Sequence, residues 1–104
     1  MIYELRRYEL HPGAGPLMRD RFRRVFAPIF AQHGWSLLQA WTDPADVDSF
    51  YVLMSFPDEE FRTEAWRIYH EDPLYVNSGD NLDLIIAKLH IHLLEDFDFS
   101  PAQA

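Results

Sequence analysis

Cysteine is absent from this sequence, and its absence excludes several kinds of chemistry at once. Without a thiol the chain forms no disulfide, offers no thiolate to a metal or an iron–sulfur cluster, and has no cysteine nucleophile. The phosphate-cradling glycine loop, the Gly-x-Ser-x-Gly elbow and the His-Glu-x-x-His motif are also missing, which disfavours nucleotide-dependent chemistry. A chain without cysteine fits a reducing compartment, so we expect a cytoplasmic protein.

Positive charge and long apolar runs are scarce as well. The chain carries 9 Lys and Arg against 17 Asp and Glu, for a net charge of −8. This charge repels phosphate backbones and anionic lipid surfaces, so we expect neither nucleic acid nor a membrane as a partner. No basic leader precedes the first strand pattern, and no segment approaches the roughly 20 apolar residues that span a bilayer.

Apolar and aromatic residues, in contrast, are plentiful. Hydrophobic residues make up 48% of the 104 positions and aromatic residues 15%, which is far too many for a disordered chain. A chain of this length holds one domain that buries roughly two-thirds of its unfolded surface. We expect a single domain over residues 1–97 and a loose tail over residues 98–104.

Hydrophobic periodicity divides the domain into six elements. Period-two or β-branched runs predict strands, and three- and four-residue steps predict helices. The predicted order is a strand at Ile2–Leu10, a helix at Leu17–His33, strands at Trp35–Thr42 and Ser49–Phe56, a helix from Pro57 that stops before Pro73, a loop at Pro73–Asn81 and a long strand at Leu82–Phe97. This β-α-β-β-α-β order is the ferredoxin-like arrangement, an α+β fold with helices on one face of an antiparallel four-stranded sheet.

The first helix carries three local signals. Pro28 removes one backbone hydrogen bond and should kink the helix near Arg24 to Ala27, and Gly34 is the residue expected at its end. The pattern also predicts a solvated basic face made of Arg19, Arg21, Arg23 and Arg24.

Two strands are apolar on both faces. In Leu82–Phe97 the odd positions from Ile85 to Leu93 are all apolar, and so are the even positions Leu84, Ile86 and Leu94. Phe50–Phe56 also has apolar residues on both faces. Because one layer of helices covers only one face of the sheet, the second face needs another cover. We therefore expect a homodimer in which the same face of a second copy packs on the first by a two-fold contact.

The opening segment from Met1 to Gly13 reads Tyr-Glu-Leu-Arg-Arg-Tyr and then runs into Pro-Gly. It closely resembles the first strand of the NIPSNAP family, which typically begins with Tyr-Glu-Leu-Arg-x-Tyr and continues to Pro-Gly. Later positions look like landmarks of the same family over nearly the whole chain, namely Pro28, His33-Gly34, Trp41 and Asp72-Pro73.

The resemblance implies the dimeric α/β-barrel superfamily, in which two ferredoxin-like sheets close into a barrel across a dimer. It does not imply a reaction, because no reaction is generally agreed for the bacterial members of the family. Relatives on this fold include cofactor-free monooxygenases, haem-degrading enzymes, polyketide cyclases, lactone isomerases and proteins without known activity.

Glu4, Arg6 and Tyr8 share one face of the first strand, which is central in this topology. One interpretation is a structural ion pair with Tyr8 hydrogen-bonded beside it. The other is a ligand pocket with candidate catalytic residues. In that pocket Arg6 would fix an anionic or carbonyl oxygen, Tyr8 would donate a hydrogen bond, and Glu4 would orient the guanidinium or act as a base.

His90, His92 and Lys88 lie together on one face of the last strand, which pairs with the first. Two placements are open for them, the same cavity or a polar patch that lines the dimer barrel or its mouth. His90 is a candidate general acid or base, and His92 and Lys88 are candidate ligand-binding residues. Two His at this spacing do not complete a metal site, because a third and a fourth ligand are not placed by the sequence, and we expect no metal.

Trp41, Trp66 and His70 complete the candidate ligand-binding residues. Trp66 and His70 stand one turn apart on the second helix and resemble the haem-degrading branch of the superfamily. That branch also uses an Asn on its first strand, and Ile2–Leu10 contains none, which argues against haem. Helix packing for Trp66 and a helix-end cation for His70 are the simpler interpretation.

The sequence thus predicts a homodimer that binds a small organic molecule in a pocket between sheet and helices, without a cofactor. Two alternatives stay open. One is a cofactor-independent monooxygenase, isomerase or cyclase of the dimeric α/β-barrel type. The other is a non-enzymatic interaction or stress-associated module in which the charged residues only stabilise the dimer.

Overall fold

A computed structural model describes residues 1–97 of the chain, which form four strands and the helices between them. In chain order the elements are β1 (Ile2–Leu10), α1 (Gly15–Arg21), η1 (Phe22–Phe26), α2 (Ala27–His33), β2 (Ser36–Asp43), β3 (Asp46–Phe56), α3 (Glu59–Glu71), α4 (Pro73–Val76), α5 (Leu82–Ile85) and β4 (Ile86–Glu95). The predicted tail at 98–104 lies outside the described residues.

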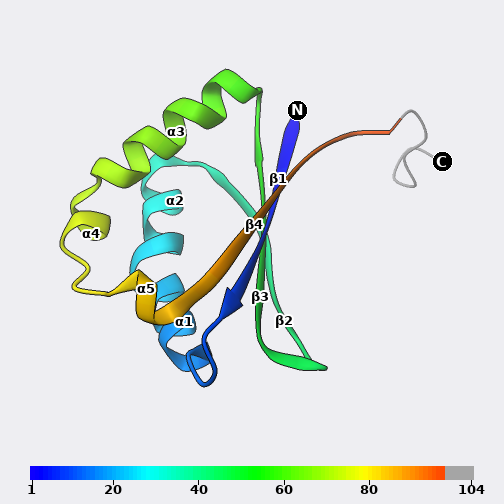
Figure 1. Ribbon diagram of the computed structural model, residues 1–104. Helices are drawn as coiled ribbons and strands as arrows, with labels where there is room; N and C mark the ends of the chain where they lie inside the picture. Colours follow the sequence, from blue (N-terminus) through cyan, green and yellow to red (C-terminus); the bar gives the residue numbers. More distant parts are fainter. Residues whose placement is uncertain (98–104) are drawn as a thin grey trace.

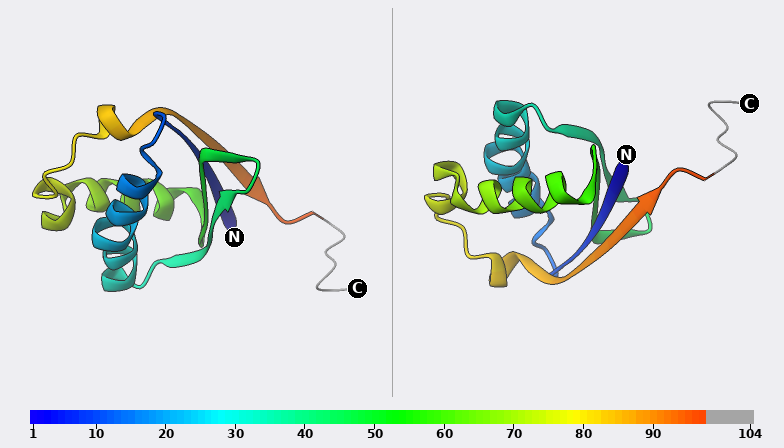
Figure 2. Two further views of the ribbon diagram at one scale, coloured as in Figure 1. Left: turned by 90° about the horizontal axis from the view of Figure 1, so that it is seen from below. Right: turned by 90° about the horizontal axis from the view of Figure 1, so that it is seen from above.

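The strands form one antiparallel sheet in the order β2-β3-β1-β4, which confirms the predicted α+β, ferredoxin-like arrangement. Within residues 1–97 every helix lies on one side of this sheet, and no helix covers the other side, which we call the bare face (Figure 1). Views from below and above show the same two layers (Figure 2). The core lies between the layers, where Phe30, Val52, Met54 and Phe56 are fully buried. Burial of this apolar surface is the main source of the fold's stability.

The first helical region runs without a break from Gly15 to His33, but its middle turn is a π-helix, η1. Here the Ala27 N–H donates to the Phe22 carbonyl, five residues back. The irregularity lies where Pro28, which has no N–H to donate, was predicted to disturb the helix. Gly34 ends the region in the left-handed conformation, at φ 69°. Within residues 1–97, no helix is both long and apolar enough to cross a membrane.

Three predicted boundaries are wrong. The last strand starts at Ile86 and not at Leu82, because Asn81 caps the helical turn α5, its side chain accepting from the Asp83 N–H at 3.1 Å. The predicted loop Pro73–Asn81 contains α4, which Asp72 caps in the same way. The β2–β3 connection is a two-residue turn, since β2 continues to Asp43 and β3 begins at Asp46.

The face of the sheet away from the helices is only partly covered within one subunit. Tyr51 and Leu53 of β3 are half-buried on this face, while Trp41 of β2 is 44% and Leu94 of β4 is 45% exposed. Leu84, which was counted toward a doubly apolar strand, belongs to the α5 turn. Burial of both faces is therefore not achieved inside one subunit, and the homodimer stays a prediction.

Candidate functional site

A carboxylate stands at the centre of the site, fully enclosed between sheet and helices. Glu4 of β1 is 0% exposed, and its two oxygens accept hydrogen bonds from the Nε atoms of Arg6 and Arg62. The indole Nε1 of Trp66 donates a third, at 2.9 Å. A buried charge is tolerated only when it is paired and hydrogen-bonded, and this carboxylate meets both conditions. With these donors in place Glu4 orients the guanidiniums, which is one of the two roles predicted for it.

Arg6 links the buried carboxylate to Tyr8. Its guanidinium lies 3.8 Å from the centre of the Trp66 ring, and its Nη1 donates to the Tyr8 hydroxyl at 3.2 Å. Burial by itself would lower the pKa of Arg6, but its neighbours Tyr8 and Glu4 outweigh this and raise the pKa above its usual value. Arg6 is thus a fixed cation, held in place on three sides.

A cavity of about 150 Å³ lies beside Arg6 and Tyr8, between the sheet and the helices. Its polar wall combines guanidiniums, phenols and an imidazole, and its apolar wall comes from the helices and from β4. The polar residues are Arg6, Tyr8, Arg21, Tyr69, His70 and Tyr75, and the apolar residues are Met18, Phe22, Phe26, Leu82, Ile86 and Leu89. An apolar hollow with a few convergent polar groups is the usual form of a small-molecule site.

The phenols in this wall are hydrogen-bond donors. Burial raises the pKa of Tyr8, more than the opposing effect of Arg6 lowers it, and burial likewise raises the pKa of Tyr69. Both hydroxyls therefore stay protonated at neutral pH. Because the Tyr8 oxygen already accepts from Arg6, its own proton is directed to another acceptor.

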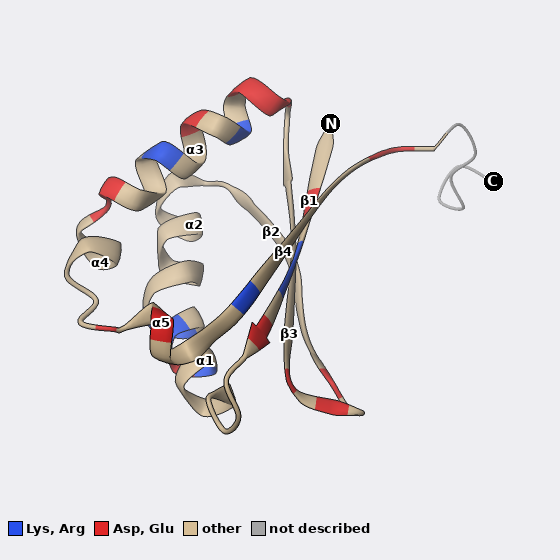
Figure 3. Ribbon diagram, viewed as in Figure 1, with Lys and Arg blue, Asp and Glu red and all other residues tan. Residues whose placement is uncertain are grey.

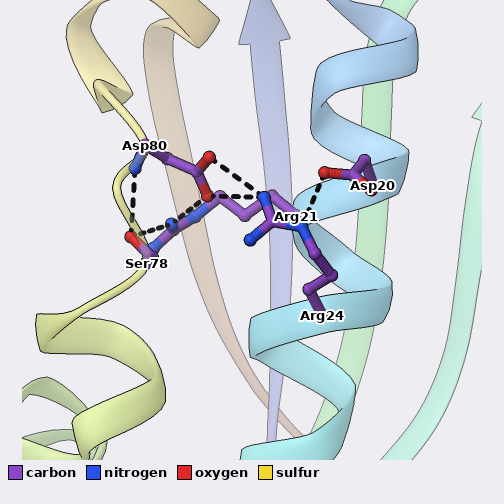
Figure 4. Close-up of polar contacts among 5 residues, drawn as sticks. All are labelled: Asp20, Arg21, Arg24, Ser78 and Asp80. Carbon is purple, nitrogen blue, oxygen red and sulfur yellow. Dashed lines mark hydrogen bonds and ion pairs between the residues drawn. The ribbon is translucent and has the colours of Figure 1, made fainter.

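Arg21 closes one side of the cavity and is tied to the loop before α5 (Figure 4). Its Nη1 donates to Ser78 at 3.1 Å and to Asp80 at 2.9 Å, and Arg24 donates to the same Asp80 carboxylate at 3.0 Å. The predicted solvated basic face is thus wrong at Arg21, which is only 5% exposed. Burial by itself would raise the pKa of Asp80, but the bonds from both guanidiniums hold it below its usual value.

We expect the replacement Asp80→Asn to destabilise the protein mainly above pH 4. The folded-state pKa of Asp80 lies below its ordinary value of 3.8. The stability that ionised Asp80 contributes is therefore complete above pH 3.8, and it disappears as the pH falls through the folded-state pKa. Thermal unfolding of the wild-type protein and of the variant, from neutral pH to about pH 2, measures the difference in stability between them. The control Asp20→Asn, which removes one exposed partner of Arg24, should have a smaller effect. A difference for Asp80→Asn that is independent of pH would contradict the ion-pair account.

The sheet register places the two groups of candidate residues on opposite faces of the sheet, so they do not share a cavity within one subunit. His90 pairs with Arg7, His92 with Leu5 and Lys88 with Glu9, so all three lie on the bare face, opposite Glu4, Arg6 and Tyr8. There the His90 ring bonds the Glu9 carboxylate, and this bond lowers the pKa of Glu9. Among residues 1–97, no three His, Asp or Glu side chains are grouped closely enough to hold a metal ion.

The remaining candidates are divided between the two faces. Trp66 belongs to the Glu4 cluster and packs in the core, as the simpler interpretation predicted. His70, one turn later on α3, lines the cavity. Trp41 lies on the bare face, where it borders a separate open hollow of about 520 Å³ together with Leu53 and Leu94.

Four polar residues of the site are not among those predicted from the sequence. Tyr69, Tyr75 and Arg21 line the cavity, and Arg62 bonds Glu4. Arg21 was placed on the solvated face, although it follows Met18 by three residues and precedes Val25 by four, which puts it on the buried stripe of the helix. A cation inside an apolar stripe is the signal that could have identified it.

Comparison with known proteins gives one family and several solved structures. The model of the NIPSNAP family matches residues 3–101. A NIPSNAP family protein from Agrobacterium tumefaciens is 20% identical, with a TM-score of 0.84 over 96% of each chain. An uncharacterized NIPSNAP domain protein from Burkholderia xenovorans is 19% identical, with a TM-score of 0.82 over 97% of this chain and 99% of that chain.

A more distant similarity connects the fold to an enzyme. A structure described as an antibiotic biosynthesis monooxygenase is 14% identical, with a TM-score of 0.69 over 93% of this chain and 99% of that chain. At such identity the similarity concerns the fold alone. No curated protein matches the chain.

Proposed function

The chain belongs to the NIPSNAP family, and we propose that it binds a small organic molecule in the cavity between its sheet and its helices. The observation that carries this proposal is the meeting of Arg6, Tyr8 and Tyr69 at a hollow with apolar walls. Each donor is fixed by packing or by a neighbour, so a ligand would find the site already formed. No carboxylate lines the hollow among the described residues, so the polar wall consists mainly of hydrogen-bond donors that suit ligand oxygens.

A cavity-filling variant tests this proposal. Leu89 and Leu93 of β4 both lie on the helix side of the sheet, but only Leu89 lines the cavity. We expect Leu89→Phe to abolish the binding of single-ring aromatic compounds found by ligand-observed NMR, because the added ring fills the hollow. The matched variant Leu93→Phe should keep these compounds. Equal binding to both variants would place the ligand elsewhere and contradict the proposal.

We further propose that the protein is a homodimer through the bare face of its sheet. This face has an apolar end at Leu53 and Leu94 beside Trp41, and a charged end at Arg7 and Glu9 that contains both signs. A two-fold contact brings an identical surface to each copy, so an apolar region and charges of both signs are self-complementary. The dimer predicted from the apolar strands would use this face.

A competing function is cofactor-independent oxygenation, isomerisation or cyclisation of the molecule held in the cavity. It is favoured by His70, an imidazole in the cavity wall that could accept a proton from a ligand. Glu4 is not suited to that task because Arg6, Arg62 and Trp66 occupy its oxygens. Mass spectrometry and NMR spectroscopy of a bound ligand after incubation in air discriminate the two, because binding alone leaves the mass and the structure of the ligand unchanged.

A further inference from the structure

The buried charges next to the cavity do not balance. Two guanidiniums, Arg6 and Arg62, share the single carboxylate of Glu4, which leaves one positive charge in excess. A second cluster, that of Arg21 and Arg24, is balanced, because these two guanidiniums face two carboxylates, those of Asp80 and Asp20. The excess positive charge therefore lies in the cluster of Glu4, Arg6 and Arg62.

Arg6 presents this excess to the cavity. Arg6 is one of the residues that line the hollow, whereas Arg62 is not. Two of its donors bond Glu4 and Tyr8, and a guanidinium has five N–H groups in all, so donors remain for a ligand. In a low-dielectric site one unbalanced charge favours a partner of charge minus one.

The size and walls of the cavity restrict the partner further. An apolar cavity of about 150 Å³ in another protein holds one benzene ring, and the hollow here has a volume of about 150 Å³. Phe22 and Phe26, stacked with ring centres 5.4 Å apart, provide aromatic walls. Among the described residues no Asp or Glu lines this cavity, and several acidic residues lie at the start of α3 and at the β2–β3 turn (Figure 3).

We propose that the ligand of this cavity is an aromatic monocarboxylate with a single ring, whose carboxylate pairs with the excess charge of the Glu4–Arg6–Arg62 cluster. This inference rests on the proposed binding function and adds its ligand class. The carboxylate accepts from Arg6 and from the Tyr8 hydroxyl, and the ring packs between Phe22, Phe26 and Leu89. A net protein charge of −8 disfavours ligands with more than one negative charge.

The test compares benzoate with benzamide, which has nearly the same shape but no charge, by NMR titration of the full chain at neutral pH. Benzoate should bind about tenfold more tightly, as expected for a hydrogen-bonded charge in a partly buried site. Arg62→Gln should remove most of this preference although residue 62 does not line the cavity, because Glu4 then neutralises Arg6 completely.

Arg19→Gln is the matched control. Arg19 is exposed and does not line this cavity, and its replacement makes the same change in net charge as Arg62→Gln. It should alter benzoate affinity by less than about twofold, since exposed charges are screened. Equal affinity for benzoate and benzamide, or an unchanged preference in Arg62→Gln, would overturn the ligand class while leaving the binding function intact. Failure of both compounds and of other single-ring compounds to bind would overturn the binding function itself.

Discussion

Replacing Glu4 by alanine is expected to lower the free energy of unfolding by about 3–5 kcal/mol. The change leaves the guanidiniums of Arg6 and Arg62 close together without their carboxylate, and it removes the acceptor of the Trp66 indole. Removing one partner of a buried, hydrogen-bonded ion pair costs more than the pair itself contributes, because the remaining charge stays desolvated. Urea unfolding at a fixed protein concentration, followed by tryptophan fluorescence, measures the difference.

A glutamate on the surface provides the control for this prediction. Glu64 forms an exposed ion pair with Arg67 on α3, and Glu64→Ala should destabilise the protein much less than Glu4→Ala, because solvent screens an exposed pair. If Glu4→Ala does not fold, Glu4→Gln tests the same point, because it keeps the shape and an acceptor but loses the charge. A loss for Glu4→Gln no larger than that for Glu64→Ala would show that the buried cluster does not support the fold.

Introducing a charge on the bare face of the sheet is expected to convert the proposed homodimer into a folded monomer. Leu53 lines the apolar hollow of that face, and a two-fold contact would bring the guanidinium of Leu53→Arg into the interface twice. The mass measured by light scattering at micromolar concentration should fall from about twice the chain mass to the 12.3 kDa of one chain.

Leu17→Arg is the control for the dimer prediction. Leu17 is an exposed leucine on α1, on the opposite side of the sheet, so its replacement adds the same charge without touching the proposed interface. This variant should remain dimeric. A monomeric wild-type protein at the same concentration, or a dimer for both variants, would contradict the assignment of the bare face.

Part of the site could be predicted from the sequence because it lies within one strand. Alternation along β1 places Glu4, Arg6 and Tyr8 on one face, and the structure joins them by hydrogen bonds. Element order predicted the sheet, and the opening segment predicted the family that the comparison confirms. These inferences depend on sequence patterns within single elements and on the order of those elements, and they require no knowledge of contacts between distant residues.

The rest of the site depends on contacts between residues that are far apart in the sequence, and local sequence patterns do not encode these contacts. Arg62 reaches Glu4 from 58 residues away, and Arg21 reaches Asp80 across 59. The position of His90 depends on strand register, since a shift of one residue moves a side chain to the opposite face. The sequence does not determine the register between β1 and β4, and the pairing of these strands also has an irregularity between Glu9 and Leu10.

We propose that this protein binds its ligand under the helices and not on the bare face of the sheet. Methyl NMR of the full chain titrated with benzoate tests it most directly. The two hollows have separate methyl groups, those of Met18, Leu82, Ile86 and Leu89 in the cavity and those of Leu5, Leu53 and Leu94 on the bare face. We expect saturable shifts in the first set and none in the second. Shifts confined to the second set, or no saturable shifts at all, would contradict the account.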